Sequence, residues 1–224
     1  MPVQTKICGL TDADAVIAAA GAGAWRMGLV FFPSSPRNIA PADALALAGI
    51  APITMERVAV FVDPSDDLLD AIMDRIPINA VQLHGNETPE RTAEISRRVG
   101  VQVIKAIGVA REEDLAQVAA YEPVCNWLMF DAKTPDDATR PGGMGEAFDW
   151  QILAGRTWKR PWILSGGLTS DNVQRAIQIS GAKFVDVSSG VESAPGVKDP
   201  RMIRSFLEAV AAVDSTPSPS PLKE

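Results

Sequence analysis

A chain of 224 residues is long for one average domain but fits a single α/β barrel, and it can bury a sizeable core. Hydrophobic residues make up 46% and charged residues 22% of the chain, which is typical of a folded globular protein and excludes a disordered composition. The net charge of −7, without any run of Lys or Arg, argues against nucleic acid or an anionic membrane surface as a partner.

Cysteine and histidine are scarce. The two cysteines, Cys8 and Cys125, lie far apart, and neither a signal peptide nor an apolar run of transmembrane length is recognisable, so we expect a cytoplasmic protein. The only histidine is His84, and no paired metal-ligand spacing accompanies it. We therefore expect chemistry without a metal.

Short apolar runs alternate with longer amphipathic stretches through most of the chain, which indicates repeated strand–helix units. Strands that are apolar on both faces and alternate with helices form a parallel sheet, either closed as a barrel or open and doubly wound, and eight units favour a (β/α)8 TIM barrel. The eight predicted strands are Gln4–Cys8, Trp25–Val30, Glu56–Phe61, Ala80–Leu83, Val103–Ala106, Trp127–Asp131, Trp162–Leu164 and Phe184–Val187.

Helix starts support this count. Thr11–Asp14 has the spacing of a capping box, Ser65 is a candidate cap, and Pro89 and Pro200 follow residues that can begin a helix. We predict one domain, the barrel of residues 1–213, followed by a disordered Pro/Ser-rich tail at residues 214–224. One face of the last helix should cover the barrel wall with Met202, Ile203, Phe206, Leu207 and Val210.

In a barrel, the chemistry is carried by loops that follow the carboxyl ends of the strands. The candidate residues at those ends are Cys8, Asp63, His84, Asp131, Ser165 and Asp186. Two of the following loops are long: residues 31–41 carry Arg37, and residues 133–150 carry three glycines. Loops of this length in a compact barrel are typical of lids or ligand grips.

Glycines follow the seventh and eighth strands, at Gly166, Gly167 and Gly190. Backbone amides freed by such turns can bind a phosphate group, and barrels commonly place a phosphate site in these two loops. Tight turns without a ligand are the alternative for each of them. A G-x-G-x-x-G fingerprint is missing from the sequence, which argues against NAD.

The reactive side chains each have two interpretations. Cys8 is either a buried apolar filler or a reactive thiol, whose pKa Lys6 would lower and a nearby carboxylate would raise. Asp131 is a general acid, a helix cap or a partner of Lys133. Asp186 and His84 could contact a ligand or a neighbouring side chain, and Cys125 has no predicted role.

Taken together, the motifs KICGLT, FFPSSPRNI, VAVFVDP, VQLHGNE, LSGGLTSDNV and DVSSGVE resemble the phosphoribosylanthranilate isomerase family of tryptophan biosynthesis, from about Lys6 to Phe206. That resemblance implies a (β/α)8 barrel that carries out an Amadori rearrangement of N-(5-phosphoribosyl)anthranilate to the 1-deoxyribulose 5-phosphate product, without a cofactor. It implies Cys8 as general base and Asp131 as general acid. It further implies Arg37 for the anthranilate carboxylate, Asp186 for a substrate hydroxyl, His84 as a wall residue, and Gly166, Gly167, Ser189 and Gly190 for the phosphate.

Two departures from the family pattern bear on the lid: Met144 replaces an expected threonine, and PDDATRP is an insertion in the same loop. Two rival functions stay open. One is that of the related histidine-pathway isomerase, which uses two aspartates as acid and base. Its first strand should end in Asp, whereas the first strand here ends in Cys8, which argues against this function. A catalytically silent barrel that binds a phosphorylated metabolite would not need Cys8, Arg37 and Asp131 together. An acidic surface without an obvious apolar stripe favours a monomer.

Overall fold

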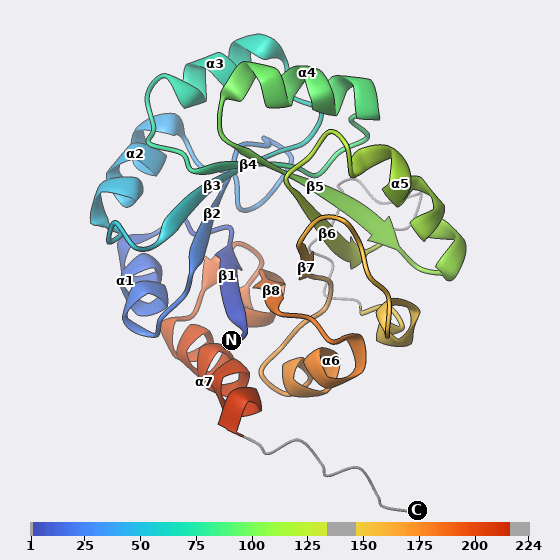
Figure 1. Cartoon of the computed structure of the whole chain (residues 1–224). Helices are drawn as coiled ribbons and strands as arrows, with labels where there is room; N and C mark the ends of the chain where they lie inside the picture. The colour runs from blue at the N-terminus through green and yellow to red at the C-terminus, as the bar shows by residue number, and fades with distance from the viewer. Residues whose placement is uncertain (1, 134–146, 216–224) are drawn as a thin grey trace, which may run out of the picture.

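The computed structural model describes residues 2–133 and 147–215, and within them eight parallel strands close into a barrel in the order β1 to β8 (Figure 1). This confirms the predicted TIM barrel, and five strands have the predicted bounds. The strands are β1 (Gln4–Cys8), β2 (Arg26–Val30), β3 (Glu56–Phe61), β4 (Ala80–Leu83), β5 (Gln102–Val109), β6 (Trp127–Ala132), β7 (Trp162–Leu164) and β8 (Phe184–Val187).

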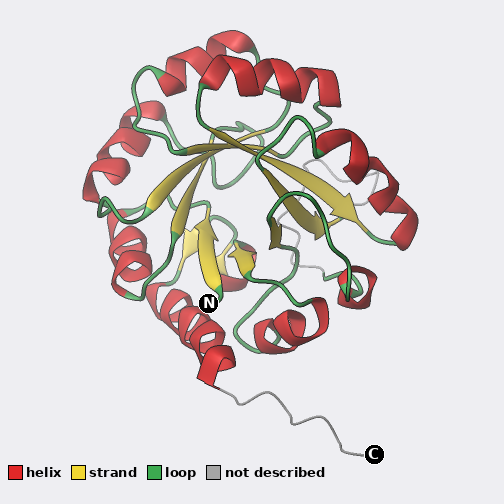
Figure 2. Ribbon diagram, viewed as in Figure 1, coloured by secondary structure: helices red, strands yellow, loops and turns green. Residues whose placement is uncertain are grey.

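Helices surround the barrel on its outer side (Figure 2). They are α1 (Ala13–Gly21), α2 (Pro41–Ile50), α3 (Asp66–Met73), α4 (Pro89–Val99), α5 (Val118–Tyr121), α6 (Val173–Ser180) and α7 (Pro200–Ser215), with 3-10 turns η1 (Glu112–Gln117), η2 (Trp150–Leu153) and η3 (Ser189–Val191). A small hairpin, β9 (Glu192–Ala194) and β10 (Val197–Lys198), follows β8. Helix α7 continues two residues past the predicted start of the tail, and residues 216–224 lie outside the described residues.

The largest difference from the predicted strands is in β5, which extends three residues past Ala106. Its added residues pair with the end of β6, where Gly108 lies opposite Asp131 and Val109 opposite Ala132. An apolar-run criterion misses this extension because Gly108 interrupts the run. The extra pairing supports the strand that carries Asp131 up to the barrel rim.

The helix starts are predicted well, with one shift. The Ser65 side chain accepts a hydrogen bond from the Leu68 amide, and Pro89 begins α4, as predicted. Helix α1 is capped by Asp12, whose carboxylate accepts from the Ala15 amide at 2.8 Å, and not by Thr11. Both residue types can cap a helix, so sequence spacing alone did not decide between neighbours.

Two apolar cores hold the barrel. The outer core lies between the sheet and the helices, and it includes four of the five predicted α7 residues; Met202 is instead 37% exposed. The inner core fills the barrel itself with the side chains of Cys8, Val30, Val58, Val60, Ala80, Ile104, Ala106, Met129 and Ile163. The barrel is therefore a packed structure and not a pore, as is usual for this architecture.

The amino-terminal end of the barrel is closed by aromatic rings around a buried arginine. The Arg26 guanidinium lies 3.7 Å from the ring centroid of Trp25 and 4.8 Å from that of Trp127, and Trp127 packs against Phe184 at 4.7 Å. Arg26 also donates to Glu56 at 2.5 Å. Because this end is filled, a ligand can reach the interior only from the carboxyl ends of the strands.

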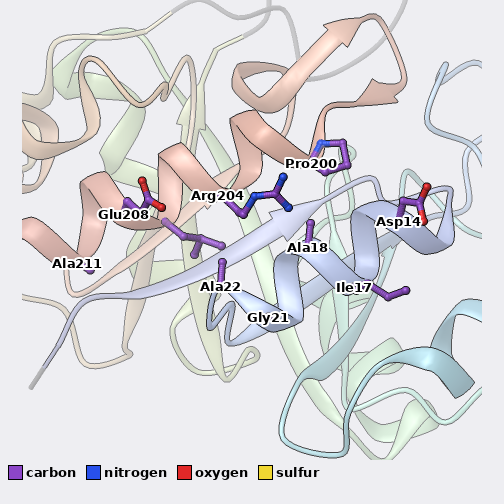
Figure 3. A pocket seen from close by; sticks show the side chains of 10 residues that line it. Asp14, Ile17, Ala18, Gly21, Ala22, Pro200, Arg204, Glu208 and Ala211 are labelled. Carbon is purple, nitrogen blue, oxygen red and sulfur yellow. The ribbon is translucent and has the colours of Figure 1, made fainter.

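The first and last helices lie side by side, and a groove runs between them on the outside of the barrel (Figure 3). Ile17 and Ala18 of α1, with Ala22 directly after it, line one wall, and Arg204 and Glu208 of α7 line the other. None of the predicted site residues lines this groove.

The loop that follows β4 is fixed by a buried ion pair. Lys105 of β5 lies 2.6 Å from the Glu87 carboxylate and donates to the Gly85 carbonyl at 2.7 Å. Glu87 also accepts from the amides of Gly85 and Asp63, and Asp63 adopts a left-handed backbone conformation with φ of 45°. Asp63 is thus part of the loop structure, and this network holds the residues that directly follow His84.

We predict that Lys105→Met lowers the free energy of unfolding by about 3–5 kcal/mol, because it leaves the Glu87 carboxylate buried without its cation. Urea unfolding followed by circular dichroism would measure this loss. The double variant Lys105→Met/Glu87→Gln is the control, since it buries no charge and should recover most of the stability. A single variant as stable as the wild type would contradict the prediction.

Candidate active site

Cys8 ends β1 beside a buried ion pair that joins the first strand to the last. Lys6 and Asp186 are register partners, and the Lys6 Nζ lies 2.7 Å from Asp186 Oδ1. The Ser165 hydroxyl donates to the other oxygen of Asp186 at 3.3 Å. There is room for the thiol and the ammonium because Gly28 stands opposite: a Cβ there would lie 2.9 Å from the sulfur and 3.2 Å from Nζ.

Burial controls the protonation of this thiol. It raises the pKa of Cys8 above its usual range, while the Lys6 and Lys198 cations act to lower the pKa and Asp186 adds to the increase. For Lys6, burial acts to lower the pKa, but the charge of Asp186, joined by that of Cys8 when the thiolate forms, acts to raise it, and the pKa is raised. Both raised pKa values favour the protonated forms, which are a neutral thiol at Cys8 and a charged ammonium at Lys6.

Asp131, at the end of β6, has two hydrogen-bond partners among the described residues, and Lys133 binds elsewhere. His84 Nε2 lies 3.0 Å from Asp131 Oδ2, and the Ala132 amide donates to Oδ1 at 3.0 Å. Lys133 pairs with Asp114 at 2.9 Å instead, which removes the ion-pair alternative. Behind the histidine, the Gln82 amide lies 2.8 Å from His84 Nδ1. His84 is thus a partner of Asp131 and not only a wall residue.

Arg37 is buried and forms a two-pronged pair with Glu192 of β9. Its Nε and Nη2 donate to the two carboxylate oxygens at 2.6 and 2.8 Å. Lys198 of β10 lies 2.6 Å from the same carboxylate. Burial alone would raise the pKa of Glu192, but the hydrogen bonds from Arg37 and Lys198 lower it, whereas burial lowers the pKa of Lys198.

This hairpin connects the arginine to the cysteine. Lys198 donates to the backbone carbonyl of Ser188 at 2.9 Å, and the Ser188 hydroxyl donates to the carbonyl of Cys8 at 3.1 Å. Gly196 at the hairpin turn has φ of 83°, and a Cβ there would lie 2.4 Å from the carbonyl oxygen of Pro36. The hairpin therefore fixes the loop after β2 against the loop after β8.

The predicted phosphate residues lie on adjoining loops after β7 and β8. A Cβ at Gly190 would lie 1.9 Å from the Leu168 carbonyl oxygen, so the two loops are in direct backbone contact. Gly166, with φ of 90°, packs on β6, and a Cβ there would lie 3.1 Å from Asp131 Oδ1. Gly166, Gly167, Ser189 and Gly190 are all half-buried at the rim.

The fold thus gathers Cys8, Asp186, Asp131 and His84 at the carboxyl ends of their strands, with Arg37 in the loop beside them. Sequence analysis missed Gln82, Glu192 and Lys198. The first lies inside an apolar-looking strand and the other two in a short hairpin without a motif of its own. Most of the predicted lid after β6, including Met144, lies outside the described residues.

Within residues 2–133 and 147–215, no group of three or more His, Cys, Asp or Glu side chains could hold a metal ion. A separate search of the same ranges finds no helix long and apolar enough to cross a membrane.

Comparison with known proteins shows the family of this chain. The family model described as N-(5'phosphoribosyl)anthranilate (PRA) isomerase matches residues 5–209. The chain belongs to the phosphoribosylanthranilate isomerase family. An N-(5'-phosphoribosyl)anthranilate isomerase of Paracoccus denitrificans is 52% identical over 212 residues, covering 95% of this chain and 99% of the relative. One from Rhodospirillum centenum is 50% identical over 214 residues, covering 95% and 100%.

Solved structures of the family share the fold. Phosphoribosyl anthranilate isomerase from Thermotoga maritima matches with a TM-score of 0.85 and 37% identity, over 94% of this chain and 99% of that one. A phosphoribosyl anthranilate isomerase in complex with reduced 1-(o-carboxyphenylamino)-1-deoxyribulose 5-phosphate matches with a TM-score of 0.80 and 34% identity, over the same shares.

We predict that Cys8 reacts slowly with iodoacetamide near neutral pH and that its rate is still rising about tenfold per pH unit where the rate of an unstructured cysteine peptide levels off, because its pKa is raised. Lys6→Met should slow the reaction further, since it removes the cation that lowers the pKa of the thiol. Mass spectrometry of the tryptic peptide that holds Cys8 would give the rate.

A Cys125→Ser background isolates the Cys8 signal, and the pKa of Cys125 itself is raised to about 11. Circular dichroism would verify that the Lys6 variant is folded. A Cys8 rate near pH 7 as fast as that of an unstructured cysteine peptide would refute the raised pKa.

Proposed function

We propose that this protein isomerises N-(5-phosphoribosyl)anthranilate to 1-(2-carboxyphenylamino)-1-deoxyribulose 5-phosphate, with Asp131 as general acid and Cys8 as general base. Family membership supports the reaction, and the positions of the two side chains at one rim support their roles. Asp131 protonates the furanose oxygen, the ring C–O bond breaks, and a Schiff base forms. Cys8 then removes the proton from C2′, giving an enolamine that tautomerises to the ketone.

The order of the strands supports a defined substrate orientation. β7 and β8 stand between β6, which carries Asp131, and β1, which carries Cys8. A phosphate held by the loops after β7 and β8 would therefore place the sugar between the acid and the base. Arg37, on the far side of Cys8, is then positioned for the anthranilate carboxylate.

The base requires a thiolate in a site that favours the thiol. Lys6 provides the counter-charge for that thiolate, and Asp186 keeps Lys6 in place. The thiolate is the reactive form of cysteine, so a thiol that stays protonated until it acts as the base avoids side reactions such as oxidation. We infer that Asp186 acts first on Lys6, and that its contact with a substrate hydroxyl is additional to that pair.

Arg37 binds the substrate carboxylate with the donors that Glu192 leaves free. Glu192 occupies Nε and one Nη2 hydrogen, so Nη1 and the second Nη2 hydrogen remain for the ligand. Lys198 and Arg37 together carry two positive charges against the single Glu192 carboxylate. The surplus of one favours an anionic ring substituent at this place.

We also propose that the loops after β7 and β8 bind the substrate phosphate and that the protein acts in the cytoplasm as a monomer. Half-buried amides at Gly166, Gly167 and Gly190 support the phosphate site. The monomer was expected from a surface without an apolar stripe. Ile17, Leu45, Ile50 and Ile53 are exposed on α1, α2 and the loop after α2, and a dimer in sedimentation velocity would contradict the monomer.

The function is tested by following consumption of phosphoribosylanthranilate, generated in place from anthranilate, by its fluorescence. We expect rapid turnover by the wild type and a loss of kcat of about two to four powers of ten in both Cys8→Ala and Asp131→Asn, because each removes one proton transfer. Cys125→Ser is the matched control and should retain full activity.

An inactive wild type would overturn the isomerase function and favour a phosphate-binding scaffold. An active wild type with an unharmed Cys8→Ala variant would keep the function and remove Cys8 as the base. Activity on the related histidine-pathway aminoaldose, measured in the same assay series, tests the rival isomerase function.

We predict that Arg37→Lys raises KM about tenfold or more with a smaller change in kcat, because a lysine cannot reproduce the planar fork that meets a carboxylate. Steady-state kinetics would separate the two parameters. Arg57→Lys is the control, since Arg57 donates to backbone carbonyls of Ala48 and Ala51, which belong to helix α2 and its end. An unchanged KM would exclude Arg37 from carboxylate binding.

A further inference from the structure

Gln82 is a polar side chain inside an apolar barrel. It lies in the middle of β4 with Val60 and Ile104 as its register partners, and it is fully buried. Its amide nitrogen lies 2.8 Å from His84 Nδ1, and His84 Nε2 lies 3.0 Å from Asp131 Oδ2. Three side chains therefore form a hydrogen-bonded series that runs from the barrel interior to the proposed acid.

The orientation of the Gln82 amide determines where the histidine carries its proton. With Nε2 donating to the ring, the amide nitrogen of Gln82 has a partner for one of its two hydrogens, and the carbonyl oxygen has none among the described residues. The opposite orientation would leave the amide nitrogen, with its two hydrogens, without a partner, and an orphaned buried N–H is less tolerated than an orphaned carbonyl. Nδ1 of His84 is thus an acceptor, and the neutral ring carries its hydrogen on Nε2.

This tautomer matches the charge that appears on Asp131 during the reaction. The His84 Nε2–H donates to Oδ2 while the Ala132 amide donates to Oδ1, so each carboxylate oxygen has one donor. Both donors stabilise the negative charge that develops when Asp131 gives its proton to the ring oxygen. A histidine protonated on Nδ1 would instead present a lone pair to Asp131 and hold the carboxyl proton back.

We propose that Gln82 is a positioning residue of the isomerase reaction, which fixes the Nε2–H tautomer of His84 so that His84 stabilises the Asp131 carboxylate as its proton leaves. This inference rests on the proposed function for the reaction itself. The tautomer, however, is a property of the unliganded protein and can be measured without substrate.

Because His84 is the only histidine in the chain, its ring can be observed alone. Protein labelled with 15N-histidine, in a long-range 1H–15N correlation spectrum at about pH 8, above the usual titration range of histidine, should show a protonated Nε2 and a bare Nδ1. In Gln82→Glu, an ionised carboxylate would accept a hydrogen bond and Nδ1 should become protonated, whereas a neutral carboxyl, which burial favours, would donate to Nδ1 as Gln82 does. A wild-type ring protonated on Nδ1 alone would overturn the proposal.

Kinetics test the consequence. Gln82→Met keeps the side-chain size but loses the donor, and we expect kcat to fall about 10–100-fold, the range typical of a group that orients a functional histidine. KM should change by less than about twofold, because Gln82 acts through His84 and not on the substrate. Ile104→Val is the matched control, since it alters packing at the register partner of Gln82 and leaves the amide in place.

A second pair of variants keeps the test independent of Gln82. His84→Gln can still direct an N–H toward Asp131, whereas the shorter His84→Asn cannot, so His84→Gln should retain clearly more kcat. Equal kcat in these two variants, or a Gln82→Met enzyme with wild-type kcat, would overturn the positioning role. A wild type without isomerase activity would overturn the proposed function instead, and the spectrum would then report the tautomer by itself.

Discussion

The buried ion pair between Lys6 and Asp186 is the interaction on which the mouth of the barrel depends. It joins β1 to β8 at paired register positions and so closes the sheet where the first and last strands meet. Burying two charges costs several kcal/mol in desolvation, and apolar replacements of such pairs are often as stable. Stability alone therefore does not account for the ion pair. Its place beside Cys8 does, because the Lys6 cation favours the thiolate form of that side chain.

Contacts extend from this pair around the rim. On one side, Ser188, Lys198 and Glu192 connect the backbone of Cys8 to the guanidinium of Arg37. On the other side, Ser165 reaches Asp186, and the loop it begins packs on Asp131. The proposed acid, the proposed base and Arg37 are thus parts of one network, and substitutions within it should combine non-additively.

Much of the fold was predictable because buried parallel strands appear as short apolar runs, and five of eight were placed to the residue. The site residues at strand ends followed from the same pattern. The partners did not: Lys6 and Asp186 are 180 positions apart, Arg37 and Glu192 are 155 apart, and His84 and Asp131 are 47 apart. No local pattern contains such a pair. Gln82 was hidden for a second reason, since one amide in a strand resembles an isolated polar substitution.

The charges of the Arg37–Glu192–Lys198 cluster and of the Lys6–Asp186 pair bear on how the ligand arrives. Three cations against two carboxylates leave the mouth with one surplus positive charge, on a chain whose net charge is −7. An anionic metabolite is repelled by the exterior and attracted only close to the rim. At physiological ionic strength the screening length is about 8 Å, so the distant acidic groups are largely masked and the local attraction dominates. In dilute buffer the acidic groups are no longer masked, so the association rate of the anion falls as salt is withdrawn. Usual electrostatic steering shows the opposite, an association rate that rises as salt is withdrawn.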